Sequence, residues 1–201
     1  IKDDLSYMYS PTPSSYILGF DLDFSPGSWW AYTSAGTHIL SIILNKKTNE
    51  TANDYAMEHL FSKIGITNYK WEADQQGNHN GGYGLYITLQ DMLRFGHLFL
   101  QEGKSAGQEI ISPGWVNKST QKWINFNSSD GYGYLWWTTQ INSEHVYYAA
   151  GYGGQYIMVV PTRALVIAAT SSSRPVAGYG NDLRSIIINE IVTSFSVPID
   201  N

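Results

Sequence analysis

Cysteine is absent from the sequence, which excludes disulfide bonds, thiol catalysis and cysteine-ligated metal sites within these 201 residues. Basic residues are few, with 12 Lys and Arg against 17 Asp and Glu. The net charge of −5 and the lack of a basic block argue against nucleic acid as a main partner. No apolar run approaches the roughly 18 residues of a membrane span, so none is expected. The lack of cysteine fits the cytosol and also a periplasmic or secreted location.

The content of hydrophobic residues is ordinary for a folded protein. Hydrophobic residues make up 43% and charged residues 14% of the chain, which is typical of a globular protein rather than a disordered one. The length allows one large domain, or a domain with an inserted lobe. We expect residues 1–145 to be mainly helices and loops, and residues 146–201 to be antiparallel strands with a terminal helix. Both parts are expected to form one fold unit.

The hydrophobic pattern predicts helices first, then a meander of strands, then one more helix. This order indicates an α+β fold rather than a parallel α/β fold. The predicted helices cover residues 34–47, 52–64, 89–99, 113–122 and 182–195, with Thr51, Thr88, Ser112 and Asn181 as caps. The predicted strands cover residues 132–138, 146–150, 155–160 and 165–170. Residues 1–15, 71–84 and 123–130 are predicted to be loops.

The stretch at residues 25–38 organises the chain. Pro26-Gly27 is a turn signal, because proline presets its own φ and glycine accepts a positive φ. Tyr32 follows at the point where irregular chain leads into a helix, and Thr33 or Ser34 can cap that helix with a side-chain oxygen. Such a junction can aim a polar side chain into a cleft. The alternative is a Tyr32 that packs by its ring, with its hydroxyl at the surface.

A second glycine-rich stretch, Gly151-Tyr152-Gly153-Gly154-Gln155, leads into an apolar run that predicts a strand. It lacks the lysine and the following helix of a phosphate-binding loop. The five histidines form no His-x-x-x-His or His-Glu-x-x-His pattern, so we expect no metal and no other cofactor. His38 is predicted to lie on a helix face. Asp91 and Arg94 are predicted to form a surface ion pair.

Residues 26–40 resemble the Pro-Gly…Tyr-x-Asn-x-Gly segment of the serine β-lactamase and penicillin-binding-protein-like superfamily. This superfamily includes class C β-lactamases, D,D-peptidases, related esterases and 6-aminohexanoate-dimer hydrolase. Residues 151–154 resemble the place of its Lys-Thr-Gly or His-Ser-Gly strand motif. The likeness continues through residues 81–85, 91–96 and 131–137. It implies a β-lactamase/transpeptidase-like fold and a serine hydrolase of the esterase or amide-hydrolase branch, acting on a small-molecule ester or amide.

The resemblance implies a role for each matching residue. Tyr32 would be the catalytic general base or proton relay beside the nucleophilic serine. Ser34 occupies the place of the motif's asparagine and Tyr152 the place of its lysine or histidine, so both would contact substrate. The missing cation argues against tight recognition of a β-lactam carboxylate.

Gly153 and Gly154 would let substrate approach the strand edge closely. The backbone N–H of Gln155 would contribute to the oxyanion hole.

The superfamily's nucleophile is a serine followed three residues later by a lysine on the same helix face. No Ser-x-x-Lys precedes Tyr32 in this sequence. The literal match Ser119-Thr120-Gln121-Lys122 follows Tyr32, which is the wrong chain order, and is predicted at the polar end of a surface helix. We therefore expect Ser119 not to be the nucleophile, and the chain to be the C-terminal portion of such an enzyme.

That portion would need a covering partner, either the N-terminal portion of the same protein or a second copy. One sheet edge and one sheet face are expected to be uncovered without it. The alternative function is a non-catalytic penicillin-binding-like module for binding or sensing. A Ser-x-x-Lys encoded upstream of Ile1 would support the enzyme, and its absence would support the binding module.

Overall fold

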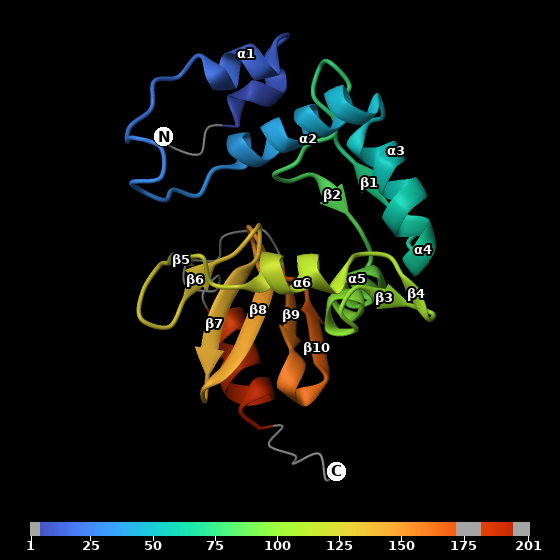
Figure 1. Ribbon diagram of the computed structural model, residues 1–201, viewed down its shortest axis with the longest axis vertical. Coiled ribbons are helices and arrows are strands. Elements are labelled where there is room, and N and C mark those ends of the chain that lie inside the picture. The colour runs from blue at the N-terminus through green and yellow to red at the C-terminus, as the bar shows by residue number, and fades with distance from the viewer. Residues whose placement is uncertain (1–4, 172–181, 195–201) are drawn as a thin grey trace. The chain divides into compact units, whose positions relative to one another are not determined.

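The computed structural model of the chain describes residues 5–171 and 182–194. Residues 1–88 and 89–201 form two compact units (Figure 1). Helices, one large antiparallel sheet and two small two-stranded sheets make up the described part of the fold, which confirms the predicted α+β class. Among the helices of the described residues, none combines the length and the apolar character needed to cross a membrane.

The first unit is mainly helical. Its helical segments are η1 (Ser6–Tyr9), α1 (Pro13–Leu18), α2 (Ser34–Thr48), α3 (Ala52–Ala56), the π-helical η2 (Met57–Phe61) and α4 (Ser62–Ile64). The short strands β1 (Lys70–Trp71) and β2 (Leu85–Tyr86) pair antiparallel around the loop between them. The prediction of loop over residues 1–15 is wrong at η1 and at the start of α1. Pro13 stands at the first position of α1, where a missing N–H costs no hydrogen bond.

Local signals set the starts of α2 and α3 as predicted. The side chain of Thr33 accepts a hydrogen bond from the backbone N–H of Gly36, and Thr51 accepts one from that of Asp54. Each bond satisfies an N–H group that has no partner within its helix. Gly65 ends α4 in the left-handed conformation, with φ 75°.

The second unit holds the sheet, two helices before it and a helix after it. Its elements are α5 (Leu89–Leu100), β3 (Lys104–Ser105), β4 (Gln108–Glu109), α6 (Pro113–Thr120), β5 (Ile124–Asn125), β6 (Gly131–Tyr132), β7 (Trp137–Ile141), β8 (Glu144–Gly151), β9 (Gln155–Val160), η3 (Pro161–Arg163), β10 (Leu165–Ala169), α7 (Asp182–Ile186) and the π-helical η4 (Ile187–Val192). The large sheet runs in the order β10-β9-β8-β7-β6-β5, with every pair antiparallel. The division into a part of residues 1–145 and a part of residues 146–201 stays a prediction.

Both faces of the sheet are covered within the second unit. Alternate residues of a strand point to opposite faces, and Tyr147 accordingly packs with Phe99 of α5 and Val116 of α6. On the other face, Tyr148 packs with the C-terminal helix through Ile187 and Val192. The expectation of an uncovered sheet face is therefore wrong, because helices from both sides of the strand region fold over it. The red helix of Figure 1 is the one that follows the sheet.

Among the described residues, the edge of the sheet at β10 is open. β10 is the last strand in the sheet order, and it pairs with β9 alone. Its side chains are packed on both faces: Ile167 joins the cluster of the C-terminal helix, and Val166 packs on the side of α5. The continuous apolar sequence Leu-Val-Ile-Ala-Ala of β10 is thus explained by packing on both of its faces, as expected for a strand covered on two sides.

Some predicted element boundaries differ from the structure. The strand predicted over residues 132–138 is broken between β6 and β7, where Leu135 has φ 64° and the N–H of Gly133 donates to the carbonyl of Trp136. Helix α6 ends at Thr120 rather than at residue 122. The predicted cap Asn181 and the predicted helix end at Phe195 lie outside the described residues.

Candidate functional site

Tyr32 lies two residues before the first residue of α2, as the sequence predicts. Its side chain is 44% exposed. Ser34 is only 6% exposed, and its carbonyl accepts a hydrogen bond from the Thr37 hydroxyl at 2.8 Å. A rigid, capped helix start therefore supports an accessible tyrosine, whereas most of the Ser34 side chain is buried.

The second glycine-rich stretch forms the tight turn between β8 and β9. Tyr152 stands at its tip and is 90% exposed. Gly153 and Gly154 have φ values of 98° and 89°, which side chains with a Cβ rarely adopt. Gly151 pairs with Gln155 across the turn, and the Gln155 side chain donates to the carbonyl of Ser171 at 3.4 Å. The glycines thus make possible a turn that presents Tyr152 to solvent.

The predicted site residues fall into two groups. Tyr32 and Ser34 belong to the first unit, while Tyr152, Gly153, Gly154 and Gln155 belong to the second. Within each group the residues are neighbours in space. That the two groups converge on one substrate stays a prediction.

A buried polar cluster lies beside the start of α2, and sequence reasoning did not find it. His38, predicted to be a helix-face residue, has no exposed surface and its Nε2 lies 3.0 Å from Oδ2 of Asp74, whose side chain is equally buried. The Tyr7 ring stacks on the His38 ring with centroids 4.9 Å apart. His38 does lie on a face of α2, as predicted. It is buried because residues 71–83 fold over that face.

Asp74 organises that overlying loop. Its Oδ1 accepts hydrogen bonds from the backbone N–H groups of Gln76 and Asn78, at 2.8 and 2.9 Å. Burial alone would raise the pKa of Asp74, but the hydrogen bonds from Asn78, His38 and Gln76 outweigh it and hold the pKa below its ordinary value. The folded state therefore favours the ionised carboxylate.

Weak signals for this cluster do exist in the sequence. Asp74 and Asn78 are residue types that bond to backbone N–H groups in turns, and they lie in a glycine-containing loop. No comparable signal marks Tyr7, which lies 73 residues before its partner Asn80. Only the fold brings such distant residues together.

The literal Ser-x-x-Lys match is not arranged as a nucleophile. Ser119 is 1% exposed rather than at the surface, and its hydroxyl donates to the carbonyl of Val116 at 3.1 Å. The Lys122 ammonium instead donates to the carbonyls of residues 127–129, each at 3.4 Å. No hydrogen bond joins these two described side chains, so the lysine does not activate the serine here.

The Asp91–Arg94 pair also differs from its prediction. Arg94 Nη1 lies 2.5 Å from Asp91 Oδ1, so the pair forms as expected. Asp91, however, is 3% exposed and not a surface residue, because α5 turns this side toward the protein interior. A buried carboxylate that bonds to arginine is costly to leave without that partner.

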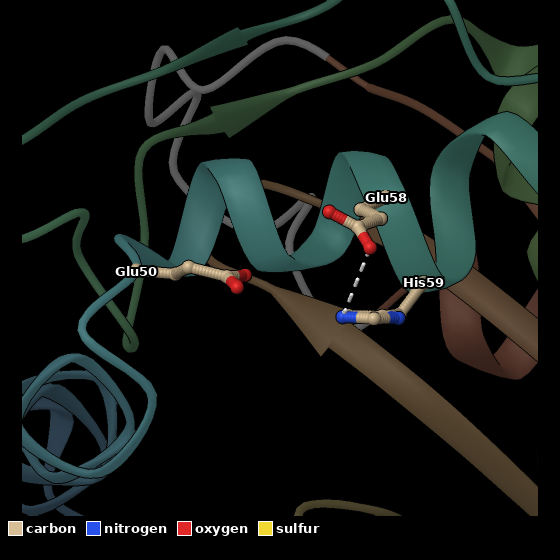
Figure 2. A group of neighbouring side chains, drawn as sticks. All are labelled: Glu50, Glu58 and His59. Carbon is tan, nitrogen blue, oxygen red and sulfur yellow. Dashed lines mark ion pairs between the residues drawn. The ribbon is translucent and has the colours of Figure 1, made fainter.

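One group of side chains has the composition of a cation ligand set. Figure 2 shows Glu50, Glu58 and His59, whose ligand atoms lie within 4.8 Å of one another. His59 Nε2 and Glu58 Oε1 are 3.9 Å apart, and the two side chains are 47% and 70% exposed. Exposed acidic groups often gather in this way without an ion, and we assign no metal to this group.

A family model described as Beta-lactamase matches residues 7–188. No curated protein matches the chain. Similar solved structures include a protein described as a 6-aminohexanoate-dimer hydrolase from Bacillus anthracis (TM-score 0.80, 21% identity), an octameric penicillin-binding protein homologue from Pyrococcus abyssi (0.72, 15%) and a protein described as a beta-lactamase from Bacteroides dorei (0.70, 18%). Each match covers 96% of this chain, but only 51%, 49% and 65% of the respective structure. At these identities the likeness shows the fold.

Proposed function

The chain belongs to the beta-lactamase family, and from this we infer that the protein containing it is a serine hydrolase that cleaves an ester or amide through an acyl-enzyme. The serine and lysine of that reaction would lie outside residues 1–201. The observation that carries the proposal is the family match over residues 7–188, with Tyr32 exposed in front of a capped helix. The chain supplies about half the length of the first two structures described above, so the activity is proposed for the whole protein.

Tyr32 would move the proton between the serine hydroxyl and the leaving group. An ordinary tyrosine ionises near pH 10, so this role needs positive charge close to its hydroxyl. The lysine that follows the serine by one helical turn would provide that charge. Substrate would pass along the turn that carries Tyr152, where a tyrosine in place of a cation favours uncharged substrates over β-lactam carboxylates.

The N–H of Gln155 would stabilise the oxyanion of the tetrahedral intermediate. A backbone donor at the start of a strand is held by the ladder hydrogen bonds of that strand, and Gln155 is the first residue of β9.

The test uses a protein that includes the gene region upstream of Ile1. If that region encodes Ser-x-x-Lys, the protein should hydrolyse a chromogenic ester or amide. Tyr32→Phe should lower kcat by about 10²–10⁴-fold, the usual range for loss of a general acid–base group. Tyr55→Phe removes a tyrosine hydroxyl from α3 of the same unit and should leave kcat unchanged. Full activity in Tyr32→Phe would contradict the role of Tyr32.

The same experiment decides between enzyme and binding module. A protein without an upstream Ser-x-x-Lys, which binds a β-lactam or an ester without turning it over, would be a non-catalytic member of the family. The 201-residue chain by itself should take up no reactive phosphonate, as read by mass spectrometry. A stoichiometric adduct on Ser119 would show that its burial does not prevent nucleophilic attack.

In this proposal an N-terminal portion would bind at the open edge of β10. An unpaired strand edge presents free N–H and C=O groups and is a template for another strand. We expect the 201-residue chain to self-associate unless the N-terminal portion is supplied. Sedimentation velocity at increasing concentration should show species larger than a monomer, which disappear when the N-terminal portion is co-expressed. A monomer at every concentration would contradict this expectation.

A further inference from the structure

We propose that Tyr7 and Asn80 are positioning residues, which hold the first turn of α2 and with it the place of Tyr32. The proposal rests on the proposed function, because that is where Tyr32 receives its role. Neither residue can touch a substrate, since Tyr7 has no exposed surface and Asn80 is 1% exposed. They would act through the backbone that carries Tyr32.

The side-chain oxygen of Asn80 is the centre of the arrangement. It accepts hydrogen bonds from the Tyr7 hydroxyl at 3.2 Å and from the backbone N–H groups of Gly82 and Tyr83 at 2.8 and 3.4 Å. Its amide nitrogen lies 3.2 Å from the sulfur of Met8. One buried carboxamide therefore ties η1 to the turn at residues 80–83.

Tyr7 carries the connection on to α2. Its hydroxyl lies 3.5 Å from the carbonyl oxygen of Ser34, the first residue of the helix. A hydroxyl has a single proton to donate, so the shorter bond to Asn80 is the stronger of the two. The stack of the Tyr7 ring on His38 adds a contact one turn further along the same helix. Tyr7 thus contacts both of the first two turns of α2.

At two glycines the loop backbone packs tightly against α2. A Cβ at Gly82 would lie 2.7 Å from the Cβ of Ser34, and one at Gly81 would lie 2.2 Å from the carbonyl oxygen of Thr37. Both distances are below normal van der Waals contact, so the loop backbone rests directly on the helix backbone. A shift of the 80–83 turn must then move the first turn of α2.

Tyr32 precedes Ser34 by two residues, so a displaced helix start moves its hydroxyl. A misplacement of about 1 Å in an active site can cost about 100-fold in rate. Loss of one distant hydrogen bond permits a smaller movement, and we expect about a tenfold effect. The effect should fall on kcat rather than on KM, because the moved group acts in proton transfer.

The first experiment measures the helix start itself, by hydrogen–deuterium exchange in the protein that includes the upstream region. Tyr7→Phe keeps the ring stack and removes the hydroxyl. The backbone amides of residues 36–38 should exchange at least about fivefold faster than in the unmodified protein. Tyr55→Phe is the control and should leave them unchanged. Unchanged exchange in Tyr7→Phe would overturn the proposal, whatever the catalytic activity.

The second experiment measures turnover in the same protein. Tyr7→Phe and Asn80→Ala should each lower kcat about tenfold, with KM changed less than twofold. The matched control is Ser41→Ala, which removes another hydrogen bond between α2 and the loop, from the Ser41 hydroxyl to the carbonyl of His79. It lies two turns from Ser34 and should leave kcat unchanged. An equal kcat loss in all three variants would overturn the proposal, because it would show that Tyr7 and Asn80 affect kcat only through the general stability of the fold.

Failure of the proposed function gives a different pattern. An unmodified protein without hydrolytic activity, or full activity in Tyr32→Phe, contradicts the function. The exchange of amides 36–38 still decides whether Tyr7 holds the helix start. Faster exchange together with an unchanged kcat in Tyr7→Phe would overturn the positioning role while the hydrolase assignment stands.

Discussion

The ionisation of Asp74 is coupled to the loop that covers α2. Its carboxylate accepts hydrogen bonds from backbone and side-chain donors of its own loop and from His38 of α2. Hydrogen bonds to a charged group contribute about 1.5–3 kcal/mol each when a single partner is deleted. This buried negative charge therefore helps to hold the loop over α2.

The lowered pKa of Asp74 predicts how stability changes with pH. The ionised form is favoured in the folded state, so its contribution is complete above the unfolded pKa of about 3.9 and is lost as pH falls through the folded pKa. Asp74→Asn should lower the free energy of unfolding by about 2 kcal/mol at pH 7, and the difference from the unmodified chain should shrink below about pH 4. Urea unfolding of both proteins from pH 7 to pH 3 measures this difference in the free energy of unfolding.

Glu109→Gln is the control for this series, because it neutralises an exposed carboxylate on β4. A difference between Asp74→Asn and the unmodified chain that stays constant from pH 7 to pH 3 would contradict the linkage.

The connection between β6 and β7 shows how one residue decides where an element ends. Residues 132–138 have the alternating aromatic pattern of a strand, yet Leu135 adopts a left-handed φ of 64° and is 51% exposed. This conformation costs roughly 1–2 kcal/mol for a residue with a Cβ. The hydrogen bond from Gly133 N–H to the Trp136 carbonyl closes the turn that replaces the middle of the predicted strand.

Leu135→Gly should therefore stabilise the chain. The expected gain in unfolding free energy is about 0.5–1 kcal/mol, which is the relief of strain less the added entropy of an unfolded glycine. Leu40→Gly is the matched control, since Leu40 is 52% exposed but lies inside α2. There glycine should cost about 1 kcal/mol. A loss of stability in both variants, measured by chemical unfolding, would show that Leu135 carries no strain.

For the whole molecule, the central prediction is that Tyr32 and Tyr152 converge on one substrate. The chain has no cysteine, so paired cysteines can be introduced without interference. Tyr32→Cys combined with Tyr152→Cys should be joined by a short bismaleimide within one molecule, in the protein that includes the upstream region. The control pairs Tyr32→Cys with Thr162→Cys, at the opposite end of β9 from Tyr152, and should not be joined. Cross-linking of the control alone would contradict convergence.

Much of the fold could be predicted because its signals are local. The caps Thr33, Thr51 and Ser112 bond to N–H groups within three residues of themselves, and the strand β9 was predicted from its β-branched run with its bounds unchanged. The broken strand at Leu135 was not predictable, because the pattern of the sequence favours a continuous strand there. The helical turns η1 and α1 were missed because segments of four and six residues are too short to show a helical repeat of apolar residues.

The sequence by itself determined the family, the order of helices and strands, the capped start of α2 and the glycine turn at Tyr152. These features depend on interactions between residues that are close together in the sequence. Such interactions can be predicted from the sequence alone. Only the tertiary structure decided that His38, Asp91 and Ser119 are buried, that both sheet faces are covered, and that Tyr7 contacts Asn80. Burial and long-range hydrogen bonds depend on which distant segments fold against each other. The pattern of neighbouring residues does not specify those contacts.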